Sequence, residues 1–123
     1  MDYDDLPLDD PVAVYLREVK SSSLTREEEK DCIDRIRRRD KTAEQAKARL
    51  VKANLELVVS IARRHHPDRI HILDLIQDGN EGLLLAVNAL RDVEPDNFAS
   101  FTAEFIERTI RRPRPKPPSG LIT

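Results

Sequence analysis

Apolar residues recur at helical spacing along most of this chain. Within residues 12–19 they follow the i, i+3, i+4, i+7 pattern of a short amphipathic helix, and Asp10 is a favourable N-cap for it. Thr25, with Glu28 three residues later, predicts a capping box at the start of a second helix that ends near Arg39.

Three longer helices follow in the same pattern. They are predicted over residues 42–66, 72–90 and 98–111. The first of them has a broad apolar face, which implies packing on two sides, and Pro67 ends it. A turn is expected around Pro95, and the prolines from Pro113 onward rule out any continuation of the last helix.

These elements predict an all-α fold, a compact helical domain of four to five helices. The composition agrees, because 39% hydrophobic and 36% charged residues with few aromatics suit a soluble helical protein. We expect an acidic disordered segment at 1–9, a short helical region at 10–40, the main helical domain at 41–112 and a Pro-rich basic tail at 113–123.

Charge and cysteine content exclude several classes of protein. The net charge is −2, so the chain as a whole lacks the basic excess of a stand-alone nucleic-acid-binding protein. A single cysteine, Cys32, excludes an internal disulfide and a cysteine-rich zinc site. No apolar run is long enough to span a membrane, and the acidic start is unlike a secretory signal. We therefore expect a cytoplasmic protein with no membrane partner.

One group of residues has metal-ligating side chains. Its members are His65, His66, Asp68, His71 and Asp74. Pro67 divides the group, and no set of ligands with the fixed spacing of a metal site is visible. No phosphate-binding glycine loop or nucleophile motif occurs either. We therefore predict no catalytic residue, no metal and no other cofactor, with a metal-dependent hydrolase as the weaker alternative.

The helix predicted at 72–90 carries more polar residues than packing alone requires. Asp74, Gln77, Asp78 and Asn80 interrupt a strongly apolar sequence. The same helix contains Gly79 and Gly82, and each glycine costs roughly 1 kcal/mol of helix stability relative to alanine. This combination indicates either a binding partner or a closely approaching neighbouring helix.

The same stretch resembles a known family. "ANLELVVSIARRH" followed by "ILDLIQDGNEGLLLAV" is similar to conserved region two of the primary-type bacterial sigma factors, the promoter-specificity subunits of RNA polymerase. The likeness runs without a gap over about residues 46–112. Upstream, "DDPVAVYLREV" and "LTREEE" resemble the short helical region that precedes region two. We expect none of the family's later domains within this sequence, because the likeness stops at region two.

The resemblance implies a polymerase-binding surface on the helix at 72–90. In the family this helix docks on the coiled-coil clamp helices of the largest polymerase subunit. The matching positions are Leu73, Asp74, Gln77, Asp78, Asn80 and Leu84. Asp78 stands where glutamate is commoner and Leu84 where methionine is often found, so charge and apolar contact are both kept. An ordinary solvated helix face is the alternative interpretation of these residues.

The resemblance also implies a DNA-melting surface, which has diverged in this chain. Two positions that are usually aromatic are Asp92 and Asp96, and Glu104–Phe105 replaces the usual tryptophan pair. Glu107 stands at a basic position, while Phe101 stands at that of a base-capturing tyrosine. The DNA-binding candidates are Phe98, Phe101, Phe105, Arg108, Arg111 and Arg112.

Charge weakens the DNA-binding prediction. Residues 91–107 contain one arginine against five carboxylates, a net −4 that opposes phosphate binding. The three phenylalanines also lie at helical spacing, which favours a role in the core. The basic tail is explained equally well by solubility.

We therefore predict a sigma-like transcription protein that binds RNA polymerase core and takes part in, or modulates, initiation. It would act as a truncated sigma factor that needs help at promoters, or as a regulator that occupies the clamp site. A minimal sigma factor that recognises the minus-ten promoter element is the alternative. A decayed product that folds without either activity is a further one.

Overall fold

The computed structural model describes residues 23–65 and 72–112. Within these ranges the chain forms only helices: α2 (Arg26–Arg38), α3 (Ala43–Ala53), α4 (Leu55–Arg64), α5 (Ile72–Ala89) and α6 (Phe98–Arg111). The all-α prediction is confirmed. The acidic segment at 1–9, the predicted helix at 12–19 and the basic tail lie outside the described residues.

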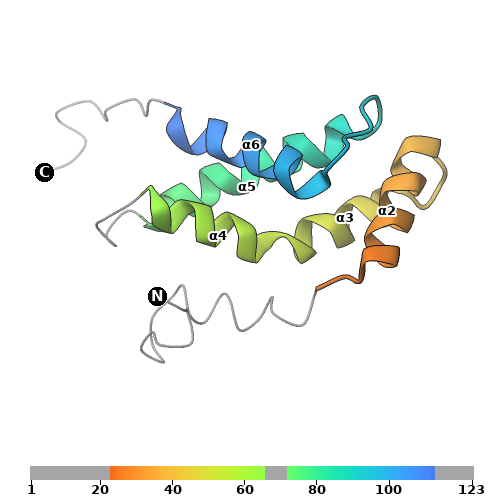
Figure 1. Cartoon of the computed structure of the whole chain (residues 1–123), viewed down its shortest axis with the longest axis horizontal. Coiled ribbons are helices and arrows are strands. Elements are labelled where there is room, and N and C mark those ends of the chain that lie inside the picture. The colour runs from red at the N-terminus through yellow and green to blue at the C-terminus, as the bar shows by residue number, and fades with distance from the viewer. Residues whose placement is uncertain (1–22, 66–71, 113–123) are drawn as a thin grey trace, which may run out of the picture.

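The helices form two layers. α5 and α6 lie alongside one another and cover the α3–α4 pair. α2 packs against α3 at the end of the molecule away from α4 (Figure 1). α5 is the central element, since it packs against α3, α4 and α6. None of the helices in the described ranges is both long and apolar enough to cross a bilayer.

The predicted start of α2 is confirmed in detail. The Glu28 N–H donates to the Thr25 hydroxyl at 3.1 Å, and the Thr25 N–H donates to the Glu28 carboxylate at 3.0 Å. This reciprocal pair satisfies two backbone donors that the first helical turn leaves without partners. The helix ends at Arg39, which adopts a left-handed conformation with φ 56°.

The prediction of one continuous helix over 42–66 is wrong. The structure divides this stretch into α3 and α4 at Asn54, whose φ of −111° and ψ of 9° depart from helical values. The Asn54 side-chain amide donates to the Leu50 carbonyl at 2.7 Å, and its backbone N–H bonds Val51 instead of Leu50. An asparagine side chain that competes for a backbone carbonyl in this way interrupts the regular ladder.

The core lies between the two layers. Its largest fully buried side chains include Ile36, Leu50, Ile61, Leu83, Leu90 and Ile106. The helices predicted at 72–90 and 98–111 are confirmed as α5 and α6, with α5 ending one residue early. Leu75 and Phe101 are only half-buried and pack at the margin of the core, and Phe105 is half-buried as well.

Candidate functional site

The polar set of α5 shares one outer face with exposed leucines. Leu73 is 51% exposed and Leu84 is 49% exposed, and Gln77 is exposed between them. Asp74 is also exposed, whereas Asp78 and Asn80 are half-buried at the edge of this face. We call these six residues, the set predicted above, the outer face of α5. It combines apolar contact area with carboxylate and amide groups.

The opposite side of α5 explains why this face points outward. Ile76, Leu83 and Val87 are buried against the other helices, so the residues between them in the helical repeat must face away. The Asn80 Oδ1 atom is buried and has no hydrogen-bond partner among the described residues.

Both glycines of α5 allow neighbouring helices to approach closely. A Cβ atom placed on Gly82 would lie 2.6 Å from the Phe105 carbonyl oxygen and 2.9 Å from the Ile106 Cα atom. A Cβ atom on Gly79 would lie 2.7 Å from a methyl carbon of Val58. Of the two explanations that the sequence left open for these glycines, close helix packing is therefore the one that the structure supports.

Two further residues of α5 are exposed beside the predicted set. Leu85 is 47% exposed, and Glu81 forms a bidentate ion pair with Arg112, at 2.8 and 3.3 Å. The Arg112 guanidinium holds the pKa of the Glu81 carboxyl below its usual value. The run Leu83–Leu84–Leu85 was the available sequence signal, because three consecutive residues of a helix spread around more than half of its circumference and cannot all face one core.

The aromatic residues of α6 separate into two environments. Phe98 is 7% exposed and belongs to the core. Phe101 and Phe105 are half-buried, with ring centroids 5.0 Å apart and planes tilted by 57°. The Arg108 guanidinium lies 5.4 Å from the centroid of the Phe105 ring, close enough for a cation–π contact. We call Phe101, Phe105 and Arg108 the aromatic ledge of α6.

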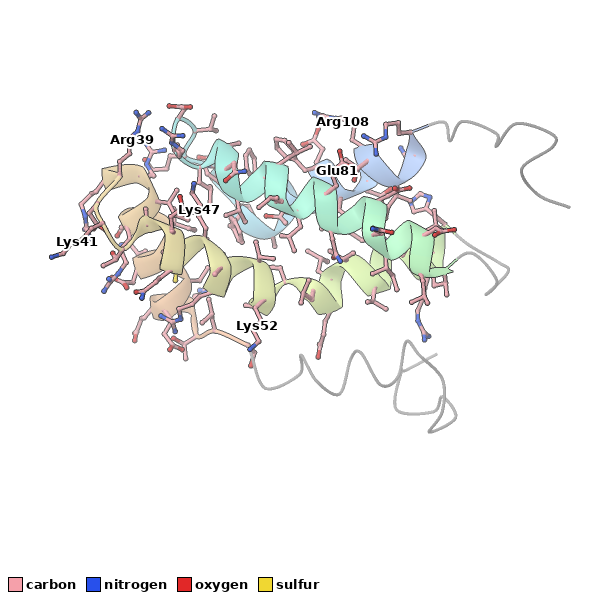
Figure 2. All side chains as sticks on the ribbon, turned by 180° about the vertical axis from the view of Figure 1, so that it is seen from behind. Arg39, Lys41, Lys47, Lys52, Glu81 and Arg108 are labelled. Atoms are coloured by element: carbon pink, nitrogen blue, oxygen red, sulfur yellow. The ribbon has the colours of Figure 1, made fainter. Side chains whose placement is uncertain are left out.

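The arginines of α6 that were predicted to contact DNA are ion-paired within the chain. Arg108 lies 3.8 Å from Glu104, and Arg111 lies 3.5 Å from Glu107. Arg112 binds Glu81 and also approaches Asp78 at 4.0 Å, so it links α6 to the outer face of α5. Figure 2 shows Glu81 and Arg108 at the same edge of the α5–α6 pair.

Cations from distant segments offset the acidic residues near α6. Arg39 binds Asp92 at 2.7 Å, and Arg37 lies 3.8 Å from Glu94. Arg39 projects at the end of the molecule where α2 leads into α3 (Figure 2). A charge count confined to residues 91–107 omits these arginines, so it overstates the negative charge of the folded surface.

The structure describes two of the five residues that the sequence analysis grouped for their metal-ligating side chains. His65 follows α4 and Asp74 lies in the first turn of α5, whereas His66, Asp68 and His71 lie outside the described residues. No group of three or more His, Cys, Asp or Glu side chains in the described ranges is arranged to hold a metal ion. Cys32 is fully buried, and burial raises the pKa of its thiol.

Comparisons with known proteins agree with the resemblance seen in the sequence. The Sigma-70 region 2 profile matches residues 50–114. The chain is 40% identical over 108 residues to RNA polymerase sigma factor SigA of Clostridium acetobutylicum, covering 87% of this chain and 28% of that protein. It is 38% identical over 106 residues to RNA polymerase sigma factor SigA of Lactococcus lactis subsp. cremoris, covering 85% of this chain and 29% of that protein.

The chain thus spans less than a third of the length of these curated relatives. Its helices α4, α5 and α6 all fall within the matched region, together with the outer face of α5 and the aromatic ledge. On this match, the chain belongs to the sigma-70 region 2 family.

Proposed function

We propose that this chain binds RNA polymerase core through the outer face of α5 and takes part in, or modulates, transcription initiation. The observation that carries the proposal is the pair of half-exposed leucines, Leu73 and Leu84, on the same face as exposed polar groups. The relatives are named as RNA polymerase sigma factors, which supports this choice of partner.

The chemistry of the outer face fits a basic helical partner. Burying an exposed leucine contributes about 1 kcal/mol when roughly half of its side chain leaves water. Carboxylate and amide groups beside it hydrogen-bond basic side chains and set the register of docking. The coiled-coil clamp helices of the largest polymerase subunit are therefore the proposed docking site. This role requires no catalytic residue or cofactor.

A paired substitution tests the proposed interface. Gln77→Ala combined with Asp78→Lys removes an amide and reverses a charge on the outer face, so we expect binding to polymerase core to weaken more than about tenfold. The measurement is competition with a full-length primary sigma factor for polymerase core, with circular dichroism to check that helicity is retained.

The matched control carries the same chemical changes elsewhere. Gln45→Ala with Glu44→Lys alters two exposed residues of another helix, α3. If the α5 variant competed as well as the unmodified chain, the proposed interface would be wrong. If both variants lost binding equally, net charge rather than the outer face would be responsible. Promoter opening followed in the same assay separates a minimal sigma factor from a clamp-occupying regulator.

A specific observation supports contact with promoter DNA as a second candidate function. The two rings of the aromatic ledge are only half-buried, and Arg108 lies over one of them. Single-stranded bases stack on such rings, and an adjacent guanidinium adds charge attraction to the backbone.

Replacing Phe101 with leucine tests this candidate, because leucine keeps apolar volume but removes the π face. We expect single-stranded DNA binding to fall by at least about fivefold, given roughly 1–3 kcal/mol per stacked base. Phe98→Leu, at a buried position of the same helix, is the control and should leave binding unchanged. Fluorescence anisotropy with a labelled minus-ten oligonucleotide measures both, and equal binding by all three proteins would argue against the ledge.

A further inference from the structure

Glu107 of α6 contacts cationic side chains from two helices. Its carboxylate lies 2.5 Å from His65 Nε2 and 3.4 Å from Arg64 Nη2, both at the end of α4. The Nε atom of Arg111, one turn further along α6, lies 3.5 Å from the same carboxylate. One acidic group is therefore shared among two arginines and a histidine.

The side chains of the cluster differ in their exposed fractions. The Glu107 side chain is 24% exposed, whereas those of Arg64 and Arg111 are 65% and 71% exposed. The carboxylate side chain is therefore largely buried, while most of each arginine side chain faces solvent. Two arginines carry more positive charge than one carboxylate neutralises, so the cluster remains cationic at its surface.

The geometry of this cluster suits a tetrahedral anion. Guanidinium groups recognise carboxylate and phosphate oxygens through the same paired N–H donors, so a carboxylate at their centre occupies the position that a phosphate oxygen would take. The donors come from the ends of α4 and α6, which pack against each other in the core.

We infer that Arg64, His65 and Arg111 form a phosphodiester-binding site for single-stranded nucleic acid, and that Glu107 occupies this site in the isolated chain. Glu107 acts as an internal competitor, which lowers the affinity of the cluster for nucleic acid. The inference rests on the proposed contact with promoter DNA, and it assigns to that contact a phosphate site separate from the aromatic ledge.

A glutamate on another helix distinguishes this site from a general charge effect. Glu44 of α3 is 85% exposed and lies 3.2 Å from Lys47, and neither residue belongs to the cluster or to the aromatic ledge. Glu44→Gln and Glu107→Gln remove the same charge and keep the same side-chain shape. Only the second change frees the cluster.

The test uses the full chain and both variants. A labelled oligodeoxythymidylate reports nucleic-acid binding by anisotropy at low ionic strength, and inorganic phosphate serves as a competitor. We expect Glu107→Gln to bind the oligonucleotide about fivefold more tightly, as one unit charge about 4 Å away in water implies, and Glu44→Gln to change binding less than about twofold. Adding Arg64→Gln and Arg111→Gln should cancel the gain.

Each other outcome overturns the inference. Equal gains in the two single variants would assign the effect to net charge, and no gain with Glu107→Gln would show that the cluster does not receive the backbone. Phosphate binding without tighter oligonucleotide binding would make it a small-anion site only. Phe101→Leu in the Glu107→Gln background separates the two proposals, because loss of stacking there leaves the gain from the phosphate site measurable. Circular dichroism checks that every variant is folded.

Discussion

At the scale of single residues, the two glycines of α5 have different surroundings. The Cβ atom of an alanine at 82 would meet backbone atoms of α6, which cannot move without shifting that helix. At 79 the shortest contact would be the Val58 methyl group, at the end of a side chain. The same residue type thus has a different structural requirement at each position.

We predict that Gly82→Ala destabilises the fold and that Gly79→Ala does so less. Alanine raises helix propensity by roughly 1 kcal/mol, but overpacking against a fixed backbone costs about 1–3 kcal/mol, so Gly82→Ala should give a net loss. Chemical denaturation with both variants measures the two changes in the free energy of unfolding. A Gly82→Ala protein as stable as the unmodified chain would contradict the close approach of α5 and α6.

Arg39 adopts a left-handed backbone conformation, which is unusual for a residue other than glycine. A left-handed backbone is unfavourable for a residue with a Cβ atom by roughly 1–2 kcal/mol, and glycine is usual at such a helix end. Here the Arg39 N–H bonds the Ile36 carbonyl at 3.1 Å, and the side chain reaches Asp92 across 53 residues of sequence. The backbone hydrogen bond offsets part of the conformational cost.

At the scale of elements, the division between α3 and α4 was not visible in the apolar pattern. The periodicity continues across Asn54, because the two helices place their apolar residues on the same side of the molecule. The interruption depends on one side-chain hydrogen bond to Leu50. Asparagine forms such a bond in some helices and faces solvent in others, so composition does not decide between them.

The capping box at the start of α2 was predictable from the sequence. It also makes the stability of the fold depend on pH. The Thr25 backbone N–H, the Thr25 hydroxyl and Arg49 together hold the pKa of Glu28 below its ordinary value of 4.5. A carboxyl whose pKa is lower in the folded state stabilises the fold fully above its unfolded pKa, and this contribution is lost as the pH falls through the folded pKa.

We therefore predict that the stability advantage of the unmodified chain over Glu28→Gln is present at neutral pH and shrinks as the pH falls below about 4.5. Glutamine can still bond the Thr25 N–H, so the cap remains while the titration is removed. Urea denaturation of both proteins at several pH values gives the difference, in which the other carboxylates cancel. A difference that does not vary with pH would rule out this contribution.

At the scale of the whole molecule, the two proposed surfaces share the α5–α6 pair. The outer face belongs to α5 and the aromatic ledge to α6, and Arg112, which directly follows α6, is ion-paired with Glu81 and Asp78 of α5. Ion pairs between remote segments also redistribute charge, because Arg37 and Arg39 of the α2 end compensate acids of the α5–α6 loop. Exposed pairs of this kind contribute little to stability, so their main effect is on the surface potential.

The sequence by itself determined that the chain is helical, the cap of α2, and the outward position of Leu73, Gln77 and Leu84. These features depend on local periodicity and short-range hydrogen bonds, which neighbouring residues in the chain specify. The family was indicated separately, by the resemblance of whole sequence stretches to its region two. Only the structure decided the break at Asn54, because its hydrogen bond to Leu50 is a local choice that the apolar pattern leaves open. Tertiary structure decided the requirement for Gly82 and the contact of Glu107 with Arg64 and His65. These depend on residues far apart in sequence, and a linear pattern contains no information on which distant side chains meet.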